Sequence, residues 1–441
     1  MRRTIFTEEH EQFRQTVRAF LAKECVPHTA EWLAAGVVSR EAWRKAGEVG
    51  LLGWMVPEDY GGLGISDFRY SVVIAEEIAA TGTQGIALAL HNDVVAPYLT
   101  DLTNEEQRHR WLPGFVAGER LVAIAMSEPG AGSDLKQIKA TARRDGDHYV
   151  LNGTKTFISN GILADLVIVV ARTDPEAGHR GMSLLVVEEG FEGFERGRKL
   201  DKIGNRAQDT AELFFRDVRV PAANLLGEEG RAFYHLMRNL PAERLGIAVY
   251  AIAHADRAFQ VTSEYACDRH AFGQPIGGFQ VNRFALAEMK TKLDVAHAYL
   301  DRCVQAALDG ELTAAEAAGA KWWATELQWE VVDRCLQLHG GYGYINEYEI
   351  ARLWRDARVQ RLYGGTTEIM KEIVGRSLGF LVPSRRRNDA IRHRPLPALV
   401  RQRPSRDRVL PRQRDDLGHH LPARPHRAGP PRRADRAVPA R

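Results

Sequence analysis

The chain has 441 residues and a hydrophobic fraction of 44%, which is ordinary for a soluble globular protein and enough for a large core in about two to four domains. No apolar run reaches the roughly 18 residues of a membrane-spanning helix, and the N-terminus lacks the apolar segment of a secretory signal. Its four cysteines form no CxxC or Cys/His cluster, so we expect a reduced, cytoplasmic compartment and no metal site.

The first part of the chain has the periodicity of helices. Phe13, Val17 and Phe20 follow helical spacing, and Pro27 closes that segment. A glycine-rich loop then separates it from a second helical run. Residues 1–123 are therefore predicted to form an all-helical domain.

The periodicity then changes to the alternation of strands. Two dipeptides favoured in hairpin turns, Asp145-Gly146 and Asn152-Gly153, stand within alternating sequence, and short β-branched runs follow. Residues 124–227 are therefore predicted to form a β-domain of the sandwich or barrel type.

Helical periodicity returns after Gly230 and continues to about Gly379. Glycine-rich breaks near residues 278 and 340 divide this part into long helices. About four or five helices in this order predict a helical bundle over residues 228–383. The fold class is therefore α+β, with a helical domain, a β-domain and a helical bundle in succession.

The C-terminal tail, residues 384–441, differs in composition from the rest. It holds 17 arginines, 5 aspartates and no lysine or glutamate, so its net charge is +12. Because the whole chain has a net charge of +3, residues 1–383 have a net charge of −9. With no aromatic residue and nine prolines, it cannot bury enough apolar surface to fold. A disordered extension, a translation artefact and a basic arm for nucleic acid or lipid are the alternatives. Because such an arm normally interleaves lysines or aromatic residues, we expect no nucleic-acid partner, and deletion of the tail should leave the activity of residues 1–383 intact.

The stretch from Trp354 to Met370, WRDARVQRLYGGTTEIM, resembles the C-terminal signature of acyl-CoA dehydrogenases. Most of that family carries a catalytic glutamate where this chain has Gly364, which cannot take a proton. The segment LPAERLGIA supplies Glu243 at the position that the long-chain and isovaleryl branches use for the base. The resemblance, closest to the long-chain branch, therefore implies Glu243 as the catalytic base and Gly364 as a backbone N–H donor to the thioester carbonyl.

Two further motifs resemble the flavin-binding segments of the same family. A glycine-rich loop alone would more often be a turn between domains, and a lone Phe or Ser is more often part of the core or of a turn. The resemblance implies that FAD is bound in IAMSEPGAGSD by Ile124, Ala125, Met126, Ser127, Gly132 and Ser133, and in KTFISNG by Phe157, Ile158 and Ser159. Phe157 could stack on the isoalloxazine ring and Ser159 could offer a hydroxyl group to flavin N5.

Later motifs resemble segments that reach the FAD of a neighbouring subunit. DRHAFGQPIGGFQ would place Arg269 at the pyrophosphate, Phe272 near the rings and Gln280 at the adenosine. QLHGGYGY, which ends a helix, would contact the adenine end through Gln337, Leu338, His339, Gly340 and Gly341. Thr366, Thr367 and Glu368 stand at a predicted helix start and would meet the phosphate and ribityl region.

The substrate site is carried over in the same way. The resemblance implies contacts with the substrate from Ser133, on its CoA side, and from Tyr234, Pro241, Ala242, Arg244 and Gly365. Adjacent residues on a helix diverge by about 100°, so Glu243 and Arg244 are not expected to be simply a mutual surface pair. Pro241 is expected to kink the helix there.

The resemblance implies FAD-dependent α,β-dehydrogenation of an acyl-CoA to trans-2-enoyl-CoA, in which a base removes the α-proton and a β-hydride passes to flavin N5. A medium-to-long-chain substrate of fatty acid β-oxidation, a homotetramer without integral membrane association, and electron-transferring flavoprotein as acceptor are expected. Alternatives on this fold are an acyl-carrier-protein or branched-chain dehydrogenase, an acyl-CoA oxidase and a nitroalkane oxidase or flavin monooxygenase. A non-enzymatic alternative is a catalytically silent binding or scaffold protein.

Overall fold

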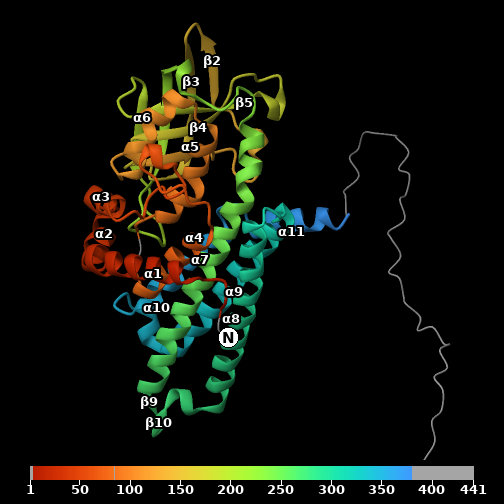
Figure 1. The fold of residues 1–441 in the computed structure, drawn as a ribbon. Coiled ribbons are helices and arrows are strands. Elements are labelled where there is room, and N and C mark those ends of the chain that lie inside the picture. Colours follow the sequence, from red (N-terminus) through yellow and green to blue (C-terminus); the bar gives the residue numbers. More distant parts are fainter. Residues whose placement is uncertain (1–2, 84, 380–441) are drawn as a thin grey trace, which may run out of the picture. The chain divides into compact units, whose positions relative to one another are not determined.

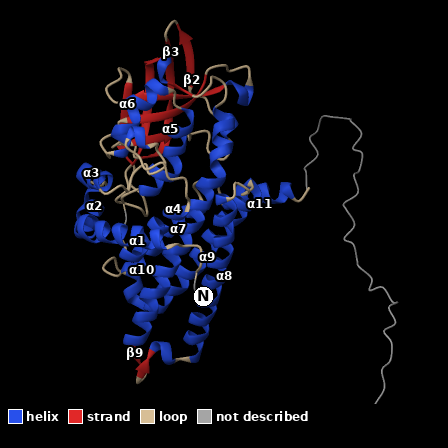
Figure 2. Ribbon diagram, in the orientation of Figure 1, coloured by secondary structure: helices blue, strands red, loops and turns tan. Residues whose placement is uncertain are grey.

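The structure, a computed structural model, describes residues 3–83 and 85–379. The predicted tail, 384–441, lies outside the described residues, as does the end of the predicted bundle. Figure 1 shows the order of the elements, and Figure 2 shows that the strands of the middle part gather at one end of the described part, with a small hairpin at the opposite end.

The N-terminal part is helical, as predicted. Its α-helices are α1 Glu8–Phe20, α2 Thr29–Ala35, α3 Arg40–Glu48, α4 Arg69–Thr81, α5 Ala96–Leu102 and α6 Glu105–Val116. Two π-helical segments, Leu21–Cys25 and Leu90–Val95, are inserted before α2 and α5. Asn104 caps α6 reciprocally, because its side chain accepts from the backbone N–H of Gln107 and the Gln107 side chain accepts from the backbone N–H of Asn104.

The middle part forms one connected sheet. Its strands run in the order β6-β7-β3-β2-β4-β5-β8, and β1 pairs with β4. Their bounds are β1 Val122–Ala125, β2 Thr141–Asp145, β3 His148–Ser159, β4 Leu166–Arg172, β5 Met182–Glu188, β6 Phe194–Lys199, β7 Thr210–Pro221 and β8 Leu225–Leu226. The pair Thr141 and Arg172 alone joins β2 to β4, so the sheet has two halves linked at one point.

The two faces of β4 explain its unbroken apolar sequence. Val167 and Val169 pack into a core formed between the two halves of the sheet, with Leu151 of β3 and Leu213 of β7. The alternate side chains of β4, such as Ile168, join a second core with helices α5 and α6. Because side chains alternate between faces, a strand covered on both sides needs apolar residues throughout.

One of the two predicted hairpin turns is confirmed and the other is wrong. β2 and β3 are joined where Asp145 pairs with His148. Asn152-Gly153 instead lies inside β3, where the register with β7 shifts. Gly153 has a φ of 151°, and a Cβ atom there would stand 2.6 Å from the Cβ of Ala140. The glycine thus serves close packing at a bulge and not a turn.

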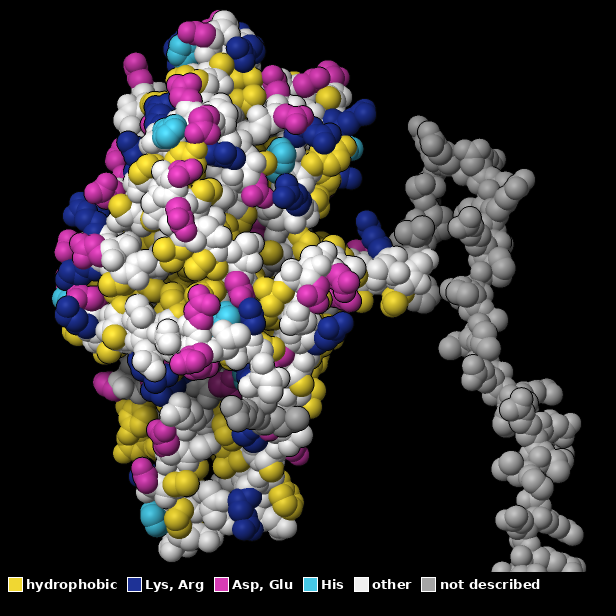
Figure 3. Space-filling model, viewed as in Figure 1, with side chains coloured by type: hydrophobic (Ala, Val, Ile, Leu, Met, Phe, Trp, Pro, Cys, Tyr) yellow, Lys and Arg dark blue, Asp and Glu magenta, His cyan; other side chains and the backbone are white. Residues whose placement is uncertain are grey.

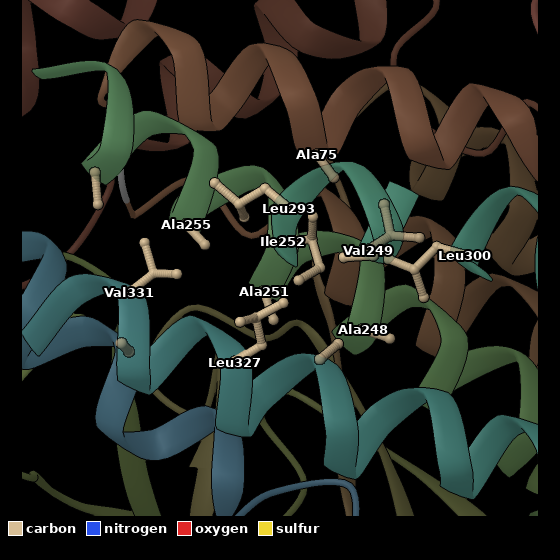
Figure 4. Packing of buried hydrophobic residues seen from close by; sticks show 14 of the residues in the cluster. Ala75, Ala248, Val249, Ala251, Ile252, Ala255, Leu293, Leu300, Leu327 and Val331 are labelled. Carbon is tan, nitrogen blue, oxygen red and sulfur yellow. The ribbon is translucent and has the colours of Figure 1, made fainter. Parts of the chain in front are cut away.

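The C-terminal part contains the predicted bundle, with five α-helices in the described residues. These are α7 Ala232–Asp268, α8 Gln280–Leu308, α9 Ala314–His339, α10 Glu349–Ala357 and α11 Thr367–Ser377, with a small hairpin of β9 His270–Ala271 and β10 Gln274–Pro275. Figure 4 shows Ala248, Ala251 and Ala255 of α7 among the larger side chains of its neighbours. Small side chains on α7 allow the helices to approach closely, so α7 forms the centre of the bundle.

Candidate active site

Glu243 lies in the first third of α7 and is buried, with 7% of its surface exposed. The hydroxyl group of Tyr98, on α5, donates to Glu243 Oε1 at 3.2 Å. Burial raises the pKa of Glu243 to about 7, and the hydrogen bond from Tyr98 and the charge of Arg244 act in the opposite direction. The group can therefore exchange a proton near neutral pH, as general base catalysis requires.

The glycine pair Gly364-Gly365 forms the turn before α11 and is held from two helices. Arg244 Nε of α7 donates to the carbonyl oxygen of Gly364 at 3.2 Å. Lys321 Nζ of α9 donates to the carbonyl oxygen of Gly365 at 2.7 Å. Arg244, which follows the candidate base in the sequence, therefore contacts the turn where this chain has Gly364 in place of the glutamate of most family members. Glu243 and Gly364 are thereby brought to the same region.

Two buried cations make this region electropositive. Lys321 has no exposed surface, and burial, followed by the nearby charge of Arg244, lowers the pKa of its ammonium group to about 8. Burial also lowers the pKa of Arg244 from its ordinary value. Their positive charges contact the carbonyl oxygens of the glycine turn. They favour negative charge that develops on a group bound near this turn.

The backbone of Gly364 is suited to present an N–H group. Its φ is 65°, in the left-handed region, and a Cβ atom there would stand 2.4 Å from Ile247 Cδ1. Within residues 3–83 and 85–379, its N–H group has no hydrogen-bond acceptor. The conformation therefore favours glycine, a Cβ atom would displace only the flexible end of the Ile247 side chain, and the N–H group of Gly364 remains available to a ligand.

Phe157 occupies an unusual position in the β-domain. It lies in β3 where the register with β7 shifts, has a φ of 60° and leaves 70% of its surface exposed. The N–H of Thr156 donates to the carbonyl oxygen of Ser127 at 3.0 Å, which joins the two predicted flavin motifs of this domain. A bulky residue rarely adopts positive φ, and such strain gathers at binding sites. This arrangement suits an aromatic side chain that stacks on a planar ring.

The other predicted flavin-binding residues differ in how much of their side chain is exposed. Ala125 and Ile158 are buried, so only their backbone can reach a ligand, whereas Gly132 and Ser133 are exposed. Thr366 caps the start of α11, where its side chain accepts from the N–H of Ile369, as the predicted helix start requires. The remaining partly exposed members are Ile124, Met126, Ser127 and Ser159, and Glu368 is exposed.

The predicted adenine-binding residues gather at the far end of the bundle. The Arg269 guanidinium lies 5.5 Å from the ring centre of Tyr342, and Tyr265 stacks on His339 at 4.3 Å. His339 is buried and hydrogen bonds to Cys335, so its ring is already engaged. Exposed members of this group are Phe272, Gln280, Gln337, Gly340 and Gly341, whereas Leu338 is half-buried.

This end is distant from the candidate base. α7 continues for 25 residues from Glu243 to Asp268, which is about 38 Å at 1.5 Å per residue. Figure 1 shows β9 and β10 at the end of α7 opposite to the sheet. Arg269 and Phe272 therefore do not join the site around Glu243 of the same chain.

Three of the predicted substrate-binding residues, Tyr234, Pro241 and Ala242, differ in their exposure. Tyr234 is exposed, with the Arg231 guanidinium over its ring and His179 beside it, and among the described residues it forms no hydrogen bond with Glu243. Ala242 is exposed and Pro241 is half-buried, and α7 continues as a helix through Pro241. Only Arg244 and Gly365 of the predicted substrate residues are brought into the site around the glycine turn.

The comparisons with known proteins agree on one family. Residues 7–119, 123–218 and 230–379 match, respectively, the N-terminal, middle and C-terminal domains of acyl-CoA dehydrogenase. Together these matches cover most of the chain. The chain belongs to the acyl-CoA dehydrogenase family.

Individual relatives support the same family. Long-chain specific acyl-CoA dehydrogenase of Sus scrofa is 50% identical over 378 residues, covering 85% of this chain and 88% of the relative. Isovaleryl-CoA dehydrogenase of Pongo abelii is 38% identical, with coverage of 84% and 89%. The crystal structure of an acyl-CoA dehydrogenase from Geobacillus kaustophilus matches with a TM-score of 0.83 at 50% identity, covering 85% of this chain and 98% of that chain.

Family membership confirms the predicted α+β fold and the enzyme class. Acyl-CoA dehydrogenases are FAD-dependent oxidoreductases that act on acyl-CoA, and a related acyl-CoA dehydrogenase of Bacillus anthracis is known in complex with FAD. That structure matches with a TM-score of 0.78 at 33% identity, covering 86% of this chain and 69% of that chain. In this acyl-CoA dehydrogenase, exposed Phe157 and the free N–H of Gly364 fit such a cofactor and its substrate. No helix within the described residues has the length and apolarity to cross a membrane.

Two residues of this site were not predicted from the sequence. Tyr98 and Lys321 each stand far from their partners along the chain, on α5 and α9. Tyr98 lies outside every motif, and an isolated tyrosine gives no signal. Lys321 stands within an otherwise alanine-rich and apolar stretch, AAGAKWWA, and that charge among apolar residues is the one signal that could have indicated a buried, functional lysine.

Proposed function

We propose that this enzyme removes the α-proton of an acyl-CoA with Glu243 as the base and forms the trans-2-enoyl-CoA. The observation that supports it is the buried carboxyl group of Glu243, whose neighbour Arg244 hydrogen bonds to the glycine turn where most of the family carries the acid. Its pKa of about 7 lets the carboxylate form exist at neutral pH while its proton affinity stays high. FAD, when bound, supplies the hydride acceptor.

The thioester carbonyl requires a hydrogen-bond donor at the same moment. The α-proton is weakly acidic because removing it places negative charge on the carbonyl oxygen. The free N–H of Gly364 can donate to this oxygen, and the two buried cations Arg244 and Lys321 hold the carbonyl groups of the turn. The turn is thus fixed before the substrate binds, and no reorganisation is needed during proton transfer.

The substrate class follows the relatives. A medium-to-long acyl chain, in fatty acid β-oxidation, is favoured by 50% identity to a long-chain specific enzyme against 38% to an isovaleryl-CoA dehydrogenase. A branched-chain or carrier-protein-linked acyl group is the second candidate, because the same placement of the base serves these substrates. Electron-transferring flavoprotein is the proposed acceptor. The four cysteines, all free, support the proposed cytoplasmic location.

A homotetramer is the proposed assembly. Val281, Phe284, Val295 and Tyr299 are exposed on one side of α8. Yellow side chains are visible over the lower parts of α7 and α8 in Figure 3. Exposed apolar patches of this kind are typical of protein interfaces. Association with other copies would also bring the distant residues Arg269 and Phe272 to a neighbour's FAD.

Substrate bleaching of the flavin tests the reaction. The yellow protein is mixed anaerobically with saturated acyl-CoAs of increasing length, and flavin absorbance near 450 nm is recorded. We expect bleaching that is greatest for medium-to-long chains. Bleaching by short or branched chains alone would contradict the proposed substrate, and no bleaching by any CoA ester would favour a carrier-protein-linked substrate or the silent alternative.

The Glu243→Gln variant tests the base. We expect the rate of flavin bleaching to fall by at least about a hundredfold while FAD stays bound, because the amide cannot accept the proton. The matched control is Glu264→Gln, which alters an exposed glutamate on the same helix and should bleach at the wild-type rate. Near-normal turnover of Glu243→Gln would rule out the assignment.

A further inference from the structure

Asp93 is a second acidic residue at the helices around Glu243, and no part of the proposed mechanism uses it. It lies in the π-helical segment Leu90–Val95, immediately before α5. Pro97 has no N–H group, so the α-helical hydrogen bond to the carbonyl of Asp93 cannot form. The local widening of the helix follows from this missing bond, and π-helical turns occur frequently at functional sites.

The carboxyl group of Asp93 is only half satisfied. Ser71 Oγ, on α4, donates to Asp93 Oδ1 at 2.6 Å. Oδ2 has no donor among the residues that the structure describes, and no basic side chain pairs with it there. Asp93 keeps part of its surface accessible, yet burial raises its pKa to about 7. Oδ2 is not among the fully buried unpartnered atoms of the described residues, so water or a ligand can reach it and supply the missing hydrogen bond.

The free oxygen faces the helix that carries the candidate base. A Cβ atom on Gly246 would stand 3.6 Å from Asp93 Oδ2 and 4.0 Å from Phe68 Cζ. Gly246 follows Glu243 by three residues, so the two positions are neighbours on one side of α7. Because Gly246 has no side chain, Oδ2 is left uncovered one helical turn from the base.

We propose that Asp93, held by Ser71, is a specificity-determining residue that binds a hydroxyl group on the acyl chain, a few carbons beyond the reacting pair. The proposal rests on the proposed acyl-CoA dehydrogenation. A hydroxyl group can donate to the carboxylate and accept from the carboxylic acid, so it satisfies Oδ2 in either protonation state. An unsubstituted methylene chain would leave this oxygen without a partner.

The location favours the acyl chain over the CoA nucleotide. Asp93, Ser71 and Gly246 stand on three helical elements that pack on one another inside the described part of the chain. No lysine or arginine, of the kind that binds phosphate groups, pairs with Asp93 in residues 3–83 and 85–379. A negatively charged nucleotide would be repelled by the Asp93 carboxylate, whereas a hydroxylated chain would not.

The first test uses the wild-type holoenzyme. We measure kcat/KM for a straight-chain acyl-CoA and for monohydroxylated acyl-CoAs of the same length, with the hydroxyl group moved along the chain. We expect one hydroxyl position to have a kcat/KM at least about tenfold above the other hydroxyl positions. Equal rejection of the hydroxyl group at every position would overturn the proposal.

The second test uses variants and compares ratios. In Asp93→Leu, the preference for the favoured hydroxyl position over the unsubstituted chain should fall by at least about tenfold, and Ser71→Ala should reduce it less. Asp59→Leu alters an exposed aspartate and should leave the ratio unchanged. An unchanged ratio in Asp93→Leu would overturn the proposal, and if that variant does not fold, the wild-type series decides. If the wild-type enzyme oxidises none of the acyl-CoAs, the proposed function itself is refuted.

Discussion

Tyr98 shows how a single side chain from another domain sets the properties of the candidate base. Its ring is fully buried, and its hydroxyl group donates to Glu243 Oε1. A hydrogen bond to the charged form of an acid favours that form. Burial therefore raises the pKa of Glu243, and Tyr98 restrains the rise.

The Tyr98→Phe variant should shift the pH dependence of the reaction. Without the hydroxyl group the pKa of Glu243 rises above about 7, so more of the base is protonated at neutral pH. The acid limb of the kcat/KM profile should move to higher pH, with a larger loss of activity at pH 6 than at pH 9. Tyr60→Phe removes a hydroxyl group that donates to Glu105 and serves as the control. A uniform loss at all pH values would indicate a purely structural role for Tyr98.

Local sequence patterns predicted the candidate residues but not their partners. Glu243 and Gly364 were predicted because each lies in a contiguous motif, and the structure brings them to the same region. Tyr98 and Lys321 act through contacts with residues far along the chain, which only the packed helices create. Sequence motifs therefore predicted the chemical groups, whereas tertiary packing determines their pKa values and orientation.

At the scale of elements, two glycine-containing dipeptides show that local sequence does not predict features that depend on distant neighbours. Asp145-Gly146 was correctly predicted as a turn because a hairpin depends on local backbone conformation. Asn152-Gly153 has an equally favourable composition, yet it lies inside β3 because Gly153 packs against Ala140. Helix and strand order follows from periodicity, so the α+β fold was predictable from the sequence, whereas a bulge that depends on a distant neighbour was not.

The Gly364→Ala variant tests the role of the backbone conformation in the turn before α11. In Gly364→Ala, the φ of 65° costs about 1–2 kcal/mol for a residue with a Cβ atom, and that atom collides with Ile247. We expect a lower Tm and at least about a tenfold lower kcat, because the N–H group is displaced from the thioester oxygen. Differential scanning calorimetry and steady-state kinetics measure both effects.

A control in the following helix separates the turn from a general effect of glycine replacement. Gly375 lies in α11 with open space around its Cβ position, so Gly375→Ala should be neutral or slightly stabilising. Adding Ile247→Ala to Gly364→Ala should relieve the collision but not the backbone strain. Wild-type kinetics in Gly364→Ala would show that the position of this N–H group is not important for catalysis.

At the scale of the whole molecule, the proposed homotetramer would bring together groups that lie far apart within one chain. The candidate base and Arg269, which is predicted to contact the pyrophosphate of FAD, are separated by about 38 Å of helix α7. The exposed apolar side of α8 begins beside Arg269's loop, at Gln280. Association through α8 would thus place one chain's Arg269 close to another chain.

Charged substitutions on α8 test this assembly and its link to the cofactor. In Phe284→Asp combined with Val295→Asp, two buried contacts of the proposed interface would be replaced by carboxylates, which are costly to bury without partners. We expect light scattering to show dissociation and the ratio of absorbance at 450 nm to that at 280 nm to fall by at least about half, because each FAD loses contacts from a neighbour. Gln305→Asp adds one carboxylate at an exposed position outside this side of α8 and should change neither quantity. If the double variant is monomeric and keeps its full FAD content, then Arg269 and Phe272 do not hold the cofactor of a neighbouring chain, and the flavin contacts of each active site all come from its own chain.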